Sequence, residues 1–521
     1  MGMPKGLSVG VSSGMFMAAD AAEKQAYLTI PRKLFYAAMK GVNFTQMDLE
    51  SITEFGEPGL VEGVKKIKEM GMTFGIHAES YAMGGTEKPI SMLDSAIETE
   101  YEHAHLRLKE HLDGCIKIGA EYLLIHSSES TAFVRLGMHL QPVRVVDPWG
   151  RPMSEFLDEN PKIFNWAIHY KPLIEVCRPR MTDYDFFYER LVENFKRDNE
   201  KREPNGEEEK EIKKIATEHA KDEMKRYLSS GDMSYGAERI AYYIIAKWMQ
   251  DNKDSLWQNI VGRKIPENDF PLLKNYKDWV PAVSAKYVAG HFKPKDSRYF
   301  DPLKIIEKNK LVFVFETPMG GSGIEGLQRL SRPRDMYYLS KEIGSPLIGF
   351  AMDFEHMLGA KIDPQKEIES LPKGAAEKCF VMHLGFPTPH NPAHIPLALG
   401  SPEQLWIYKR LWELRQKGQK NAWFIFERGG GPDPVKQSVV VIRNLVKYLE
   451  KNVEPMKLPE EFYGFPPGGP NVKLQELAMR DHFLDPLKGL LSVSEEEYTF
   501  LGKTVAEKPR GAEKWPKERY R

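Results

Sequence analysis

The sequence predicts a (β/α)8 TIM barrel with a large, mainly helical insertion after the fourth strand and a C-terminal extension. Short apolar runs typical of strands alternate with segments of helical spacing, a pattern typical of βαβ units and a parallel sheet. The alternation stops near residue 130 and resumes near residue 302. Six of the eight strand-like runs end in histidine or a carboxylate, and the active sites of such barrels lie at the C-terminal ends of the strands.

The predicted strands are short and rich in β-branched and aromatic residues. The first two are LSVGVSS at 7–13 and VNFTQMDLE at 42–50. The other six each carry a candidate ligand at their end: TFGIHAE with His77, YLLIHSS with His126, LVFVFET with Glu316, LIGFAMDFEHM with Asp353 and His356, KCFVMHLGF with His383, and WFIFERGGG with Glu427.

Helices are predicted between these strands. PRKLFYAAMK at 31–40 places proline in a first turn, and apolar positions 60, 64, 67 and 70 have helical spacing closed by Gly71. A long helix is expected over 95–119; its His103, His105 and His111 lack i,i+4 spacing and are interpreted as surface residues. Further helices are expected at 334–343, 364–371, 402–417 and 433–451.

The predicted domain boundaries follow from this alternation: 1–129 for the first half of the barrel, 130–301 for the insertion, 302–451 for the second half and 452–521 for the extension. A charge run at 201–226 in the insertion is interpreted as a solvated helical face with i,i+4 pairs. Its tryptophans and arginines, Trp149 and Arg151 among them, could grip a nucleic-acid strand, but packing in the insertion's own core is the favoured interpretation. The extension is expected to contain short helices at 472–480 and 494–501 and to wrap the barrel or contact a partner.

Composition narrows the function classes. With 521 residues and 41% hydrophobic residues, the chain can bury a large core. Lys and Arg total 73 against 74 Asp and Glu, which argues against a strongly basic nucleic-acid binder. No apolar run approaches the roughly 20 residues that span a bilayer, so no membrane partner is expected. Three cysteines without C-x-x-C spacing, and no signal-peptide pattern at the start, predict a cytoplasmic protein.

The strand ends together predict a divalent-metal centre. Imidazoles combined with carboxylates suit zinc or manganese. A single histidine at a strand end is more often an ordinary hydrogen-bonded residue. Burying Glu316, Asp353 and Glu427 in one mouth without a cation, however, would cost several kcal/mol each, which favours the metal interpretation.

At this point the sequence resembles the endonuclease IV and xylose isomerase-like TIM barrels over about residues 7–128 and 302–450. The resemblance rests on these motifs: HAESY at 77–81, IGAEYLLIHSS at 118–128, ETPMGGSG at 316–323, DFEHMLGAKID at 353–363, HLGF at 383–386, His394 and Glu427.

The resemblance implies three metal subsites. The first would consist of His77, His126 and Glu316. The second would share Glu316 as a bridge and consist of Glu316, Asp353, His383 and Glu427. The third would take His356 and His394, but endonuclease IV has an aspartate two residues before the last histidine and this chain has Pro392 there. His390 or Asn391 could substitute for that aspartate.

Two activities follow from the resemblance. The main expectation is a phosphodiester hydrolase of the endonuclease IV type, using a metal-bound hydroxide and two or three Zn²⁺ ions, with abasic DNA as one candidate substrate. The alternative is a sugar isomerase or epimerase that uses one Mn²⁺ or similar ion, with Glu316 and Glu427 as the acid and base. The pair His77 and His126 favours the hydrolase slightly. A third hypothesis makes the insertion and tail assembly elements; the oligomeric state is not predicted.

Overall fold

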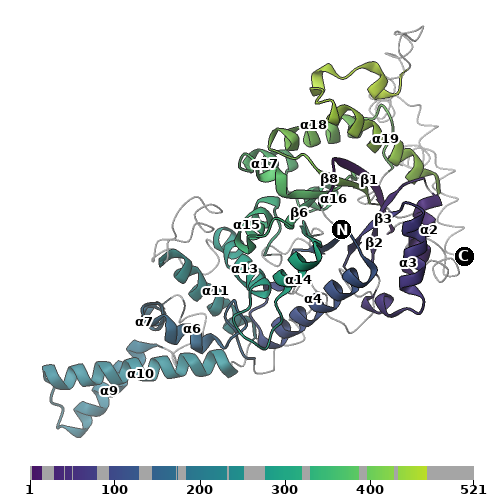
Figure 1. Cartoon of the computed structure of the whole chain (residues 1–521). Coiled ribbons are helices and arrows are strands. Elements are labelled where there is room, and N and C mark those ends of the chain that lie inside the picture. The colour runs from purple at the N-terminus through teal and green to yellow at the C-terminus, as the bar shows by residue number, and fades with distance from the viewer. Residues whose placement is uncertain are drawn as a thin grey trace, which may run out of the picture. The chain divides into compact units, whose positions relative to one another are not determined.

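The structure is a computed structural model, and it describes residues 3–13, 29–39, 41–49, 51–78, 93–127, 143–171, 173, 183–230, 234–251, 276–318, 329–386, 396–427 and 432–465. Eight parallel strands form a closed barrel in the order β1 to β8, with β8 pairing to β1. Helices surround the strands (Figure 1). The predicted fold class is confirmed.

The strands coincide with the predicted apolar runs. Their bounds are β1 (Leu7–Ser12), β2 (Phe44–Asp48), β3 (Thr73–His77), β4 (Tyr122–His126), β5 (Val312–Glu316), β6 (Ile348–Asp353), β7 (Cys379–His383) and β8 (Ala422–Phe426). Every residue of β4 to β8 is buried. Parallel strands are covered on both faces, which explains why their sequences are almost continuously apolar.

The register of the strands brings the candidate ligands to one level. Asp48 pairs with His77 across β2 and β3, and His126 pairs with Glu316 across β4 and β5. Asp353 pairs with His383 across β6 and β7. Because these pairs stand at the ends of their strands, their side chains belong to the same rim of the barrel.

The helices of the barrel lie close to the predicted positions, except that residues 354–357, expected at the end of a strand-like run, belong to a helix. Their bounds are α2 (Ile30–Met39), α3 (Leu60–Glu69), α4 (Glu98–Ile118), α14 (Pro302–Asn309), α15 (Pro333–Ile343), α16 (Phe354–Gly359), α17 (Pro364–Ser370), α18 (Pro402–Gln416) and α19 (Pro432–Glu450). Short 3-10 helices are η2 (Ile52–Gly56) and η5 (Ala375–Lys378). As expected, α4 ends at Gly119, whose φ of 68° is left-handed and suits glycine.

The segment between β4 and β5 is mainly helical, as expected. Its helices are α6 (Met153–Glu159), α7 (Pro161–His169), α9 (Tyr184–Asp198), α10 (Gly206–Ser230), α11 (Ser234–Asp251) and α13 (Tyr276–Phe292). The predicted charge run forms α10, which buries one stripe at i,i+4 spacing: Ile212, Ala216, Ala220, Met224 and Leu228. The last of these helices packs on the barrel, because Phe292 contacts Phe313 and Phe315 of β5 at ring-centroid distances of 5.0 and 5.8 Å.

The chain divides into two compact units. The first contains Met1–Pro396 with Glu413–Ile442, and the second contains Leu397–Trp412 with the chain from Arg443 onward. Two 3-10 helices, η6 (Pro455–Lys457) and η7 (Glu460–Tyr463), belong to the second unit. There, buried Phe462 packs on Tyr408 and Tyr448 at 5.1 and 5.5 Å. The tail helices expected at 472–480 and 494–501 lie outside the described residues. No helix in the described ranges is long and apolar enough to cross a membrane.

Candidate metal centre

The strand ends gather into two groups of potential metal ligands that share one residue. The first group is His77, His126 and Glu316, and the second is Glu316, Asp353, His383 and Glu427. Within each group the ligand atoms lie within 4.8 Å of one another. The two groups coincide with the first two subsites that the sequence resemblance implied.

Glu316 lies at the centre of the site and is fully buried. Its Oε2 atom is 2.9 Å from His77 Nε2 and 3.6 Å from His126 Nε2. Its Oε1 atom is 2.6 Å from His383 Nδ1. The two oxygens of one carboxylate therefore face the two different groups, which is the arrangement of a bridging ligand.

His383 is surrounded by the carboxylates of the second group. Its Nδ1 atom lies 3.1 Å from Glu427 Oε2 and 3.2 Å from Asp353 Oδ2, in addition to its contact with Glu316. Glu316 Oε1 and Glu427 Oε2 are buried, and neither accepts a well-directed hydrogen bond from any described residue. Buried carboxylate oxygens in this condition, beside an imidazole nitrogen, are suitable ligands for a divalent cation.

Two of the histidines outside β7, His77 and His356, each have one ring nitrogen that contacts a backbone carbonyl. His77 Nδ1 lies 2.7 Å from the carbonyl oxygen of Ala78, and His356 Nδ1 lies 2.9 Å from that of Thr317. A carbonyl oxygen only accepts, so both Nδ1 atoms carry a proton and the Nε2 atoms are left for another partner. In His77, Nε2 is the atom that faces Glu316, as metal ligation requires.

His356 belongs to neither ligand group. It lies in the first turn of α16, where Asp353 Oδ1 caps the helix by accepting a hydrogen bond from His356 N at 2.7 Å. Its Nδ1 atom is 3.6 Å from Glu316 Oε1 and 3.7 Å from Asp353 Oδ2. Its predicted third-site partner His394, together with Pro392, lies outside the described residues, so the third subsite remains a prediction.

At the candidate metal site, neighbouring carboxylates raise the pKa values of three histidines, whereas burial alone would lower them. Burial alone would lower the pKa of His77, but the hydrogen bond and charge of Glu316 raise it to about 9. Burial works in the same way on His383, whose pKa is nevertheless raised well above its ordinary value by Glu316 and Glu427. His356 likewise has a raised pKa, owing to Asp353 and Glu316 acting against burial.

The carboxylates show the complementary pattern. Burial would raise the pKa of Glu316, yet the charge and close contact of His383 and the hydrogen bond with His77 hold it well below 4.5. The pKa of Asp353 is also lowered, because His356 and His383 outweigh burial. For Glu427 burial dominates and raises the pKa. Protonated imidazoles thus supply the positive charge that a metal ion would supply in their place.

The structure adds residues that the sequence interpretation missed, three of them on β1 and β2 and one, Tyr122, at the start of β4. His383 Nε2 lies 2.9 Å from Gln46 Oε1, which also accepts a hydrogen bond from the Tyr122 hydroxyl at 2.9 Å. Gln46 Nε2 donates to Asp48 Oδ1 at 3.3 Å, and Ser12 Oγ donates to Asp48 Oδ2 at 3.0 Å. A glutamine inside an apolar strand, two residues before a terminal aspartate, was the available signal.

Two interpretations of residues away from the strand ends are also decided. His105 and His111 were expected on the surface, but both are buried, because α4 is covered on more than one side by neighbouring elements.

Trp149 packs within the insertion, 5.8 Å from Trp248 and beneath Lys295 at 3.6 Å. The favoured packing role of the tryptophans is therefore supported for Trp149.

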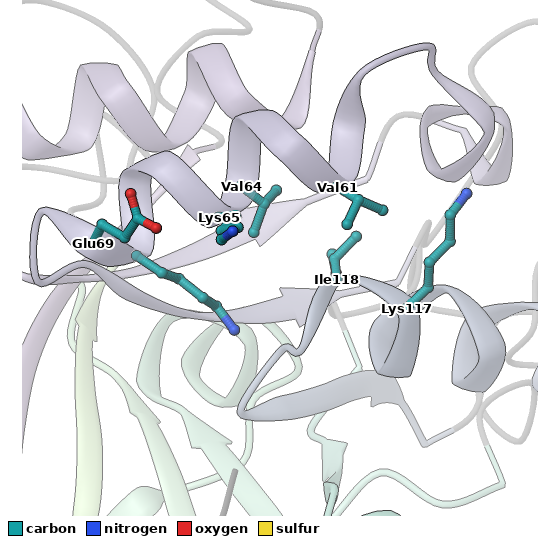
Figure 2. A pocket seen from close by; sticks show the side chains of 7 residues that line it. Val61, Val64, Lys65, Glu69, Lys117 and Ile118 are labelled. Atoms are coloured by element: carbon teal, nitrogen blue, oxygen red, sulfur yellow. The ribbon is translucent and has the colours of Figure 1, made fainter.

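A groove on the outside of the barrel is unrelated to this site. It has a volume of about 430 Å³ and lies between α3 and the last two residues of α4. Figure 2 shows Val61, Val64 and Ile118 among its lining side chains, with lysines at its edges. Its lining includes none of the residues at the strand ends.

Comparisons with known proteins concern the fold. No family model and no curated protein matches the chain. Among solved structures it is similar to an L-ribulose 3-epimerase, with a TM-score of 0.39 and 11% identity over 87% of this chain and 98% of that one. A D-tagatose 3-epimerase-like protein gives a TM-score of 0.41 and 10% identity, over 86% of this chain and 100% of that one.

A third similar structure is a fusion of a xylose isomerase-like TIM barrel with 4-hydroxyphenylpyruvate dioxygenase. Its TM-score is 0.38 at 11% identity, over 90% of this chain and 46% of that chain. These similar structures are xylose isomerase-like barrels and epimerases, and none of the three is an endonuclease IV. At such identities and TM-scores, the likeness is one of fold and assigns no role to any residue of this chain.

Proposed function

We propose that this chain is a divalent-metal-dependent isomerase or epimerase that acts on a neutral polyhydroxy ketone, the chemical class of the ketoses. The observation that carries the proposal is the compact donor set at the ends of β5 to β8. It consists of three carboxylates and one imidazole: Glu316, Asp353, His383 and Glu427. This oxygen-rich set suits Mn²⁺ or a similar ion better than it suits a zinc site, which usually contains more nitrogen or sulfur donors.

The charges around this donor set favour a neutral substrate. Among the described residues, the last residue of each strand and the residue directly after it include no Lys or Arg. Lys33 comes near, but its Nζ atom donates to the carbonyl oxygen of Asp48 and pairs with Glu54 at 2.8 Å. Sites for phosphate groups usually present arginine or lysine side chains. Carboxylates, imidazoles and hydroxyls are instead suitable partners for the hydroxyl groups of a sugar.

A bound divalent ion would polarise the substrate carbonyl group. Glu427 is the best-placed base for removing the proton from the adjacent carbon, because its side chain is 15% exposed and burial raises its pKa. Glu316 is fully buried with a lowered pKa, which favours its role as a ligand. Epimerisation needs a second acid–base group on the opposite face of that carbon, and Glu316 stays the candidate for it.

His356 is suited to bind a substrate hydroxyl. Its Nδ1–H group donates to Thr317, so Nε2 is available as an acceptor. The ring is 7% exposed and adjoins Asp353. In this role His356 would orient the substrate beside the donor set, without itself being a metal ligand.

One observation favours a second candidate, the two-metal phosphodiester hydrolase. Glu316 faces His383 with one oxygen and His77 with the other, as a carboxylate bridging two ions would. Two close ions can activate water and stabilise both the attacking and leaving oxygens of a phosphodiester. Among the described residues, however, the first ligand group has only two potential ligands besides the shared Glu316.

Metal content and two parallel activity assays distinguish these candidates. Protein purified without added metal is analysed for Mn, Co, Fe and Zn per chain. It is then incubated with ketoses in D2O, where proton abstraction exchanges deuterium into the substrate, and separately with bis(4-nitrophenyl) phosphate. One ion per chain with deuterium exchange supports the isomerase. Two zinc ions with phosphodiester cleavage and no exchange would overturn it in favour of the hydrolase.

A further inference from the structure

His383 is held from both sides of its ring. Its Nδ1 atom faces the three carboxylates of the donor set, and its Nε2 atom faces Gln46 Oε1 at 2.9 Å. His383 and Gln46 are 337 positions apart and are both completely buried. The contact therefore joins β7, which carries a ligand, to β2, which carries none of the predicted ligands.

The neighbours of Gln46 determine the orientation of its amide group. The NH2 group donates to the carboxylate of Asp48, and the oxygen accepts from the Tyr122 hydroxyl. A rotated amide would place its oxygen against the Asp48 carboxylate and its NH2 group against the His383 ring. Since an amide oxygen only accepts hydrogen bonds, His383 Nε2 must carry the proton. The lone pair of the neutral ring is then on Nδ1, where a metal ion would bind.

We infer that Gln46 is a positioning residue of the metal centre, which holds His383 in the tautomer and ring orientation that a divalent cation requires. Tyr122 shares this role by occupying the second acceptor position of the same oxygen. The inference rests on the metal site of the proposed function and not on the reaction, so cation binding alone tests it. A histidine ligand whose outer hydrogen-bond partner is removed commonly binds metal about 10- to 100-fold more weakly.

The support for Gln46 continues onto the first strand. Asp48 accepts from Ser12 Oγ with its second carboxylate oxygen, and Asp48 N donates to Ser13 Oγ at 2.8 Å. A continuous set of hydrogen bonds thus runs from β1 through β2 to the ligand on β7. Each of these bonds narrows the positions that the Gln46 amide can take.

The test is a titration of metal-free protein with Mn²⁺, followed by calorimetry, on wild type and Gln46→Met. Methionine has a similar volume but offers His383 Nε2 no acceptor of comparable strength. We expect Mn²⁺ affinity to fall about 10- to 100-fold, with one ion still bound at saturation. With Co²⁺ as the probe, the visible absorption bands of the bound ion should shift, because the imidazole is no longer fixed in orientation.

Gln419→Met is the matched control. Gln419 is also buried, and its Nε2 donates at 3.2 Å to the carbonyl oxygen of Cys379. Cys379 is the first residue of β7, and His383 is the last. This variant should lose comparable folding stability while keeping wild-type Mn²⁺ affinity. Gln46→Glu keeps an acceptor for His383 and should bind Mn²⁺ more tightly than Gln46→Met. Tyr122→Phe removes only the second donor and should weaken binding by less than Gln46→Met.

The outcomes are separable. Weaker binding in Gln46→Met with unchanged affinity in Gln419→Met supports the inference. Wild-type affinity in Gln46→Met overturns it while leaving the metal site and the proposed function intact. Equal losses in the two glutamine variants would assign Gln46 to general packing, and this also overturns the inference. A wild-type protein that binds no divalent cation would overturn the metal site itself.

Discussion

In the described part of the chain, buried histidines occur in two regions, and their surroundings shift the pKa in opposite directions. At the strand ends, His77 and His383 face carboxylates, which raise the pKa of each against the effect of burial. On α4, burial is the main influence and lowers the pKa of His111 to about 4. Nearby, His105 and His291 lie 3.2 Å apart at Nδ1, and burial lowers the pKa of both.

The comparison teaches that burial of a histidine does not by itself indicate function. Neutral histidines between helices act as packing residues: His111 meets Phe55 edge-on at 6.3 Å, and its Nδ1 donates to the carbonyl oxygen of Arg107 at 2.8 Å. Histidines that a protein keeps beside buried carboxylates carry charge at neutral pH unless a cation replaces their protons. The sign of the pKa shift therefore separates His77 and His383 at the strand ends from His105 and His111 on α4.

The largest effect is expected from Glu316→Gln, which removes the carboxylate that the two ligand groups share. Mn²⁺ affinity should fall by more than about 100-fold, beyond the usual loss for an outer partner of a ligand, and activity should fall with it. Calorimetric titration with Mn²⁺ measures this change. Glu367→Gln is the control, because Glu367 is also buried but lies on α17 outside both ligand groups. Unchanged binding in Glu316→Gln would remove the basis of the site.

Lowering the pH should destabilise the protein through the buried His111 on α4. His111 has a folded-state pKa of about 4, below the unfolded value near 6.5, so the stability it contributes is present above pH 6.5 and is lost as pH falls through 4. The full loss is on the order of 3 kcal/mol. Urea unfolding of wild type and His111→Leu at pH 7 and pH 4.5 measures it. The variant should show a smaller loss between these two pH values; equal losses would show that His111 is not buried in its neutral form.

Raising the pH should also destabilise the protein when no metal is bound, in this case through the pair of His77 and Glu316. The pKa of His77 is raised to about 9, so the stability from its pairing with Glu316 is complete below pH 6.5 and is lost as pH rises from 6.5 through 9. Thermal unfolding of chelator-treated protein at pH 6.5 and pH 9 should show this loss. Saturating Mn²⁺ should reduce this loss, because an ion bound to Glu316 in the second ligand group lowers the pKa of the neighbouring His77. An identical pH dependence with and without metal would contradict the assignment.

The smallest effect is expected from His126→Ala. For a one-metal isomerase, the metal content should stay at one ion per chain and deuterium exchange should fall by less than about tenfold, since the second ligand group alone holds the ion. Elemental analysis and the exchange assay measure both quantities. Complete loss of activity together with loss of one of two ions would instead favour the hydrolase.

The sequence predicted the barrel and the residues of both ligand groups because strand-end positions are a local feature. His77 and Glu316 can be recognised from their own segments, without knowledge of their neighbours in space. The contact of Gln46 with His383 could not be recognised in this way, since it depends on which strands face each other across the barrel. The burial of His105 and His111 was missed for a related reason. Spacing along α4 does not reveal how many neighbours cover the helix.

The choice of activity was less accessible from the sequence. The pair His77 and His126 favoured a phosphodiesterase, and both residues do lie beside Glu316. The proposal of a neutral substrate depends in part on the long-range contacts of Lys33. The positions of the candidate ligands were thus easier to predict than the chemistry proposed for them.

The insertion between β4 and β5 has a consequence for the order of folding. His77 and Glu316 are 239 positions apart in the chain, yet they meet in the same small site. Such distant pairings form late, because the ends of a long segment must be brought together before the contact contributes stability. A cation that needs the closed barrel would therefore slow unfolding, while leaving the rate of folding almost unchanged.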